Sequence, residues 1–171
     1  MATVPTINRS WIADEFSKGI EGMRSSVDIA NERATSPPHA ALSVLYHEMA
    51  SVAEKNRDVV ETIAIRYGYS PTKSVTEGIS ETLGRLKDRM EDLVTSETEL
   101  EKVSHDLMAK ANSIHWCTAW IQTFQGIGDV ESAQELSGVL ADERAHRDAL
   151  QEGLNRMVLK GASGEEVSHG S

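Results

Sequence analysis

Apolar residues recur every three or four positions over long stretches of this chain, the spacing that places them on one face of an α-helix. Over residues 9–34 the repeated apolar positions are Ile12, Phe16, Ile20, Met23, Val27, Ala30 and Ala34. The pattern starts again after the Ser-Pro-Pro of residues 36–38, because serine caps a helix and proline fits its first turn. This second helix is predicted to end near Tyr67, before the Gly-Tyr-Ser-Pro stop signal at residues 68–71.

Two capping boxes, each a Ser or Thr followed three residues later by Glu, mark helix starts in the second half of the chain. The box at residues 74–77 opens a shorter crossover helix to about residue 94, and the box at residues 96–99 opens a long helix to about Ile127. Asp129 then caps a last helix that ends near Lys160. The pattern therefore predicts an all-α fold, an antiparallel four-helix bundle with an additional helix in the crossover between the second and third long helices.

Composition supports a single domain. The chain has 171 residues, of which 39% are hydrophobic and 26% charged, enough for one sizeable core. We expect an N-terminal arm at residues 1–8, the helical bundle at residues 9–160 and a disordered tail at residues 161–171, where small and polar residues dominate.

The charge balance narrows the classes of partner. The 27 acidic residues outnumber the 17 basic ones, giving a net charge of −10, and such a surface repels both phosphate backbones and anionic lipid. We therefore expect no nucleic acid and no membrane as a partner. The single cysteine, Cys117, and the polar start of the chain predict a cytoplasmic protein, with the thiol acting as a small buried side chain.

Candidate chemistry is concentrated in the last predicted helix. Glu143 and His146 are three residues apart, so they share one side of a helix and could both bind one metal ion. Glu143 also falls on the apolar stripe of its helix, where a charged group needs a partner. That partner could be Arg147, four residues further along the same helix, or a metal.

Residues 128–146, GDVESAQELSGVLADERAH, resemble the last helix of ferritin-like proteins. The shared features are a Gly-Asp turn, a leucine-spaced helix and an acidic cluster with Glu-x-x-His. Two long hairpins joined by a crossover segment also match the ferritin-like layout, and the chain looks most like the YciF-type stress-response proteins. The resemblance implies a di-metal site, with one carboxylate from each of two helices and Glu-x-x-His from each of the other two.

His115 is the candidate third ligand. It lies as many residues before the last turn as Glu143 lies after it, and equal counts mean equal height in an antiparallel hairpin. His115, Glu143 and His146 are therefore the candidate ligands for iron, manganese or zinc, with Glu48 at the core boundary as a further possibility.

The first two helices do not complete the ligand set of the family. The second helix has no Glu-x-x-His, and Asn56 takes a core position where a ligand is expected. A reduced site with one metal and a protein with no metal at all are both left open.

A second apolar side on the third long helix points to another interface. Its residues, at helical spacing opposite the main stripe, are Trp116, Trp120, Phe124 and Ile127. A helix that is apolar on two sides must be covered twice, here either by the crossover helix or by a second protomer in a homodimer.

Two functions follow from these patterns. The first is a ferritin-like stress-response protein whose di-metal site is degenerate or absent, with at most a reduced site built from the last two helices. The second is a metal-free dimeric bundle that acts as an interaction or scaffold module through the aromatic side. Neither pattern identifies a catalytic residue.

Overall fold

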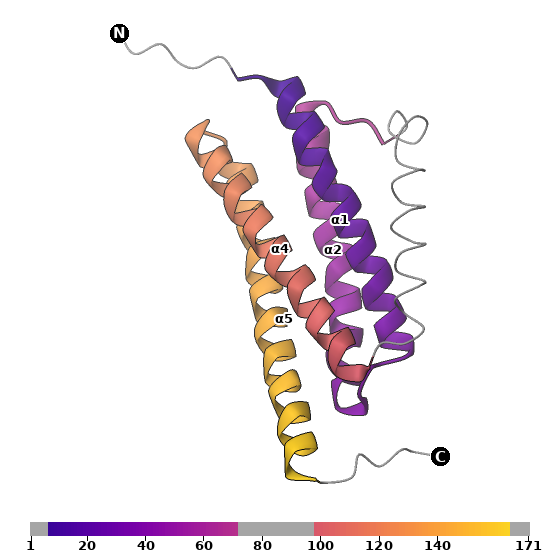
Figure 1. Ribbon diagram of the computed structural model, residues 1–171. Helices are drawn as coiled ribbons and strands as arrows, with labels where there is room; N and C mark the ends of the chain where they lie inside the picture. Colours follow the sequence, from indigo (N-terminus) through magenta and orange to yellow (C-terminus); the bar gives the residue numbers. More distant parts are fainter. Residues whose placement is uncertain (1–6, 72–97, 165–171) are drawn as a thin grey trace.

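Helices joined by short turns make up the residues that the structure, a computed structural model, describes, namely 7–71 and 98–164. Its elements are α1 (Arg9–Thr35), the 3-10 turn η1 (Ala40–Leu42), α2 (Ser43–Tyr67), α4 (Glu99–Gly126) and α5 (Val130–Ser163) (Figure 1). Within those two ranges there is no strand, so the predicted all-α class is confirmed there. The crossover helix predicted over residues 74–94 lies outside the described residues. None of the described helices combines the length and the apolar character that crossing a membrane requires.

Capping groups explain most helix ends. Gly68 ends α2 as predicted, in the left-handed conformation with φ of 106° that glycine adopts without strain. Asp129 caps α5 as predicted, because its side chain accepts a hydrogen bond from the backbone N–H of Ser132. The third long helix has a capping box, but Thr98 and Glu101 form it, so the box predicted at residues 96–99 is wrong. The Ser/Thr-x-x-Glu pattern occurs twice in this segment, at residues 96–99 and 98–101, and the helix begins at the second.

Two further predicted boundaries need correction. Ser36 closes α1, with its backbone N–H donating to the carbonyl oxygen of Glu32, and does not cap the next helix. His39 caps the start of η1 instead, through its Nδ1, which accepts from the backbone N–H of Ala41. At the other end, α5 continues to Ser163, so residues 161–163 belong to the bundle rather than to the expected tail.

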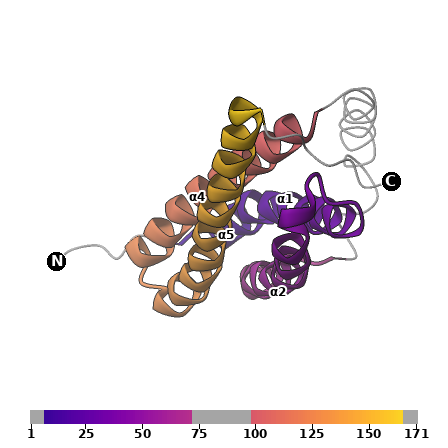
Figure 2. The same cartoon turned by 90° about the horizontal axis from the view of Figure 1, so that it is seen from below.

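The helices form two antiparallel hairpins, α1–α2 and α4–α5 (Figure 1). The end of α2 lies at the α4–α5 turn, because the Tyr67 hydroxyl donates to Asp129 at 2.5 Å. The end of α1 lies beside the first turns of α4, where Arg33 contacts Asp106. Helices α2 and α4 therefore run parallel, and the chain leaves α2 at one end of the bundle and enters α4 at the other. Seen from below, the two hairpins cross obliquely (Figure 2).

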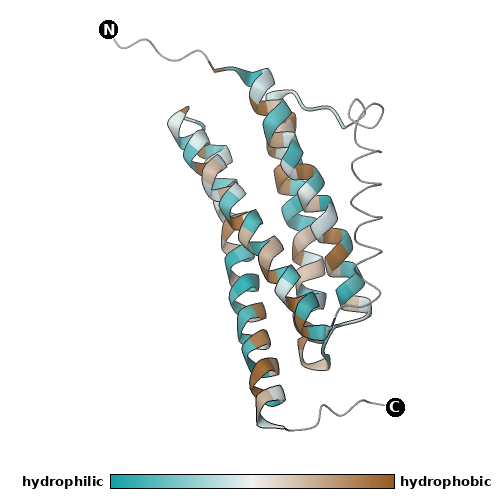
Figure 3. Ribbon diagram, viewed as in Figure 1, coloured by the Kyte–Doolittle hydropathy of each residue, from teal (hydrophilic) through white to brown (hydrophobic). Residues whose placement is uncertain are grey.

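Apolar and polar residues are interspersed along every described helix, as expected for amphipathic elements (Figure 3). The buried apolar side chains form two clusters. The aromatic cluster, nearer the α4–α5 turn, includes Phe16, Ile20, Ile63, Tyr67, Trp120, Phe124 and Leu136. The second cluster, nearer the α1–α2 turn, includes Val27, Leu42, Tyr46, Met49, Val103 and Leu150.

The aromatic side of α4 faces inward, contrary to prediction. The Phe16 ring of α1 lies 5.1 Å from the Trp120 ring and 5.3 Å from the Phe124 ring, measured between centroids. Trp120 is only 9% exposed and Phe124 is fully buried, and the half-buried Trp116 and Ile127 pack against the same cluster. Helix α1 therefore covers these side chains, and neither the crossover helix nor a second protomer is needed to do so.

A glycine makes this packing possible. The Trp116 ring lies against Gly19 of α1 so closely that a Cβ on Gly19 would stand 2.0 Å from a ring carbon. The prediction failed because it placed the buried face of α4 by its apolar residues alone. That face also contains Asp106 and Lys110, whereas the apolar Leu100 in the first turn of α4 is exposed. The buried face is therefore rotated toward the tryptophans.

Candidate functional site

Between the two apolar clusters the core becomes polar. Four buried polar side chains from three helices lie there, and we call them the polar layer: Asn56 of α2, Lys110 of α4, and Glu143 and His146 of α5. An ion pair of 3.6 Å between Lys55 and Asp142 places this part of α2 level with this part of α5. Helix α1, which the structure describes in full, contributes only apolar residues to the core before Arg33.

A buried ion pair forms the centre of the polar layer. Lys110 Nζ donates a hydrogen bond of 2.9 Å to Glu143 Oε1, and the two residues are 7% and 3% exposed. Removing two opposite charges from water is tolerated when they are in direct contact and hydrogen-bonded, and costs several kcal/mol, as an order of magnitude, when either stands alone. Each charge of this pair is therefore needed to keep the other inside the protein.

Glu143 occupies the core position that its spacing predicted, but Arg147 is not its partner. Arg147 is partly exposed and binds the neighbouring Asp148, with 2.7 Å between a guanidinium nitrogen and a carboxylate oxygen. The cation that meets Glu143 comes instead from α4, in the other half of the same hairpin.

The other two members of the polar layer have unpaired polar atoms. Asn56 is 1% exposed, and neither its amide nitrogen nor its amide oxygen has a hydrogen-bond partner among residues 7–71 and 98–164. Nδ1 of buried His146 is likewise without a partner there. Burial lowers the pKa of His146, and the nearby positive charge of Lys110 acts in the same direction. Unpaired buried polar atoms are uncommon in folded proteins, which makes this layer unlike ordinary core.

The predicted metal ligands are not brought together. Glu143 and His146 lie side by side in the core, but His115 is exposed on α4, and Glu48 is exposed on α2. In the described parts of the chain, no group of three or more His, Cys, Asp or Glu side chains is placed to hold a metal. The predicted triplet is therefore wrong, because counting residues from the turn gave the height of His115 but not the side of α4 on which it lies.

Lys110 was missed because a lysine is not expected on a buried stripe. Its position does carry a signal, since it lies seven residues from both Val103 and Cys117, two turns along the same face of α4. An acidic core position on the following helix, Glu143, would have been the reason to look for a basic partner there.

The residues present do not fit a di-metal centre of the ferritin-like kind. At the level of the polar layer, the buried residues of α2 are Ala53 and Asn56, whereas such a centre needs Glu and His there. On α4, the inward side chain is Lys110, whose ammonium has no lone pair to give and repels cations. Only Glu143 and His146 keep the expected types, so no chemical step is assigned to a metal here.

Comparison with known proteins identifies no relative. No protein-family model, curated protein or solved structure matches this chain. The features that bear on function are therefore the polar layer, the topology of the helices and the resemblance of residues 128–146.

A second buried polar cluster lies nearer the α1–α2 turn, beside the second apolar cluster, and sequence analysis did not detect it. The Tyr46 hydroxyl and Arg33 Nε both donate to Asp106 Oδ2, over 2.6 and 3.2 Å, so one carboxylate joins α1, α2 and α4. Burial, followed by the Asp106 charge, raises the pKa of Tyr46 far above its usual range, which keeps this phenol protonated. We call these residues the Asp106 cluster.

The thiol of Cys117 has no chemical role in this geometry. Cys117 is fully buried, as predicted, and burial raises its pKa to about 12, with the Glu143 charge acting in the same direction. A thiol that stays protonated at neutral pH is a poor nucleophile and a poor metal ligand.

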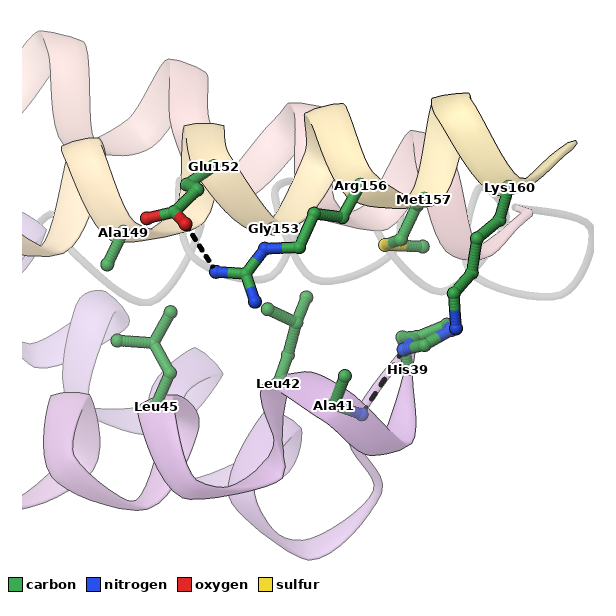
Figure 4. Close-up of a pocket in the computed structure, with 10 residues that line it drawn as sticks. All are labelled: His39, Ala41, Leu42, Leu45, Ala149, Glu152, Gly153, Arg156, Met157 and Lys160. Atoms are coloured by element: carbon green, nitrogen blue, oxygen red, sulfur yellow. Dashed lines mark hydrogen bonds and ion pairs between the residues drawn. The ribbon is translucent and has the colours of Figure 1, made fainter. Parts of the chain in front are cut away.

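A groove of about 310 Å³ lies between η1 and the end of α5, away from the polar layer (Figure 4). Its apolar lining includes Leu42, Leu45 and Met157, and a Cβ on Gly153 would stand 2.5 Å from Leu42. The charged groups around it lie at the surface, with Arg156 neutralised by Glu152 at 2.7 Å. Since every polar lining side chain is at least partly exposed, the groove lacks the buried polar anchor of a specific site.

Proposed function

We propose that this chain is a ferritin-like stress-response protein whose di-metal site has been lost, and that it acts without metal redox chemistry. The observation that carries the proposal is the Lys110–Glu143 ion pair in the polar layer. The positive charge of Lys110 in the polar layer would repel a pair of metal ions bound beside it.

The helix topology supports the ferritin-like part of the proposal. Helices α2 and α4 run parallel, so one long connection must pass from one end of the bundle to the other, as in ferritin-like bundles. An additional helix within that connection belongs to the proposal. Such bundles build their metal sites in the core from facing helices, which is where the polar layer lies.

Loss of the site accounts for the composition of the layer. Glu143 and His146 retain the Glu-x-x-His spacing, while Ala53 and Asn56 stand at the same spacing on α2. The amide of Asn56 and Nδ1 of His146, which have no partner in the described parts of the chain, are understandable as remains of a layer that once faced a ligand. A core selected only for packing would have replaced them with apolar side chains.

The alternative, a scaffold acting through the aromatic side of α4, has less support. Trp120 and Phe124 pack against α1 and are not available to a partner. A homodimer stays part of the proposal only through a different surface, and a cytoplasmic location stays part of it as well.

Metal analysis of the purified protein tests the proposal. We expect no stoichiometric iron, manganese or zinc, a melting temperature that neither chelator nor added metal changes, and Fe(II) oxidation no faster than in buffer. Stoichiometric metal that raises the melting temperature would overturn the proposal, as would catalysed Fe(II) oxidation.

A further inference from the structure

We propose that the polar layer is a divalent-cation site closed by one side chain, Lys110, whose ammonium takes the place of the metal ion. The inference rests on the proposed function and adds what keeps the site closed. Replacing Lys110 with a carboxylate should open the site to zinc or cobalt.

The ammonium of Lys110 balances the buried charge of Glu143. Glu143 is 3% exposed, so its negative charge must be balanced inside the protein, and Lys110 Nζ does this from 2.9 Å. A divalent cation bound to the same carboxylate would serve the same purpose. The ammonium and the metal are therefore alternatives at one location, and binding of the second requires removal of the first.

Besides Lys110, the polar layer contains side chains of the types that bind metal ions. His146 lies three residues from Glu143 on the same side of α5, and its Nδ1 has no partner within the described residues. Asn56 on α2 has an amide oxygen that no other described residue pairs with. Imidazole nitrogen, carboxylate oxygen and amide oxygen all bind divalent cations, so the layer holds three potential ligands besides Lys110.

Lys110 prevents a divalent cation from entering the polar layer. Its ammonium repels a divalent cation and offers hydrogens where a ligand must offer a lone pair. Lys110→Glu removes both obstacles and adds a carboxylate from α4. The variant would then have one carboxylate from each helix of the α4–α5 hairpin, with His146 three residues from Glu143 on α5 and Asn56 buried at the same level on α2.

The test uses the full-length protein, first stripped of metal. Wild type, Lys110→Glu and the double variant Lys110→Glu/His146→Ala are titrated with Zn²⁺ and Co²⁺, while calorimetry, the visible bands of Co²⁺ and the melting temperature are recorded. We expect Lys110→Glu to bind about one equivalent, at least about tenfold more tightly than wild type. Its melting temperature should rise with metal, and the double variant should lose both effects.

Two controls separate charge from ligation. Lys110→Met removes the ammonium without adding a ligand, so it should bind Zn²⁺ more weakly than Lys110→Glu. If Lys110→Glu is unfolded without metal, Zn²⁺ should restore its helical circular dichroism. Lys110→Gln, which adds a neutral oxygen ligand, should then show weaker, His146-dependent binding.

The inference is overturned if folded Lys110→Glu binds no metal, if its binding survives loss of His146, or if Zn²⁺ fails to restore an unfolded variant. These results concern variants only. Stoichiometric metal in the wild-type protein would instead contradict the proposed function, so the two failures can be told apart.

Discussion

The two buried polar clusters of this bundle differ in how completely their atoms are paired. In the Asp106 cluster, a hydroxyl and a guanidinium donate to the same carboxylate oxygen, and three helices are joined by it. In the polar layer, the Lys110–Glu143 pair lies near an Asn56 amide and a His146 nitrogen without partners among the described residues. Fully paired polar groups are explained by stability alone, whereas unpaired ones require another reason, such as a lost ligand.

The largest expected effect comes from breaking the buried ion pair. Glu143→Leu leaves the Lys110 ammonium without its partner, so urea denaturation should show a loss of about 3–5 kcal/mol in the free energy of unfolding. Lys110→Met/Glu143→Leu removes both charges and should recover most of that loss. Glu152→Leu, at an exposed ion pair with Arg156, is the matched control and should change little. A double variant as unstable as the single one would contradict the electrostatic explanation.

The next effect tests the paired cluster. Asp106→Asn keeps the shape of the side chain but removes the charge that Arg33 and Tyr46 share, so a loss of about 2–3 kcal/mol is expected in the same measurement. Asp148→Asn, at an exposed pair with Arg147, is the control. If Asp106→Asn proved neutral, the cluster would not be the structural tie that its hydrogen bonds indicate.

Much of the fold could be predicted from the sequence, because the helices, their ends at Gly68 and Asp129, and the core position of Glu143 follow from local spacing and capping. Lys110 and Asp106 could not be placed in this way. Their burial depends on partners far along the chain, Glu143 and Arg33, and a stripe identified by apolar residues excludes them. The aromatic side of α4 was misplaced for the same reason, although Gly19 in the middle of α1 hinted at a close contact.

A smaller effect, of opposite sign, sharpens the comparison between the clusters. Asn56→Leu replaces two polar atoms that no described residue pairs with by apolar ones of similar volume, so thermal and urea unfolding should show a gain of about 1 kcal/mol. Tyr46→Phe removes a hydrogen-bonded hydroxyl and should lose about 1 kcal/mol. Asn31→Leu, at an exposed position of α1, controls for the change in helix propensity. Destabilisation by Asn56→Leu would mean that the amide is paired in solution, for example with water.

The smallest effect is a pH dependence from His146. Because burial lowers its pKa in the folded state, the unfolded chain takes up this proton first. The contribution to stability is therefore complete above about pH 6.5 and is lost as the pH falls through the folded-state value. Urea denaturation at a series of pH values should show this decline in wild type and in the exposed-site control His115→Gln. In His146→Gln the decline should be smaller, and an unchanged profile would show that His146 is not its source.

The parallel course of α2 and α4 has a consequence for the order of folding. Most close contacts are made within each hairpin, between segments joined by a short turn, and few are made between hairpins. Contacts close in sequence form fast, and those that require a long loop to close form slowly. Each hairpin can therefore assemble early, while the core that contains Asn56 on one side and Glu143 on the other is completed only on docking. The polar layer is thus finished last, when charges already paired within the α4–α5 hairpin are enclosed by α1 and α2.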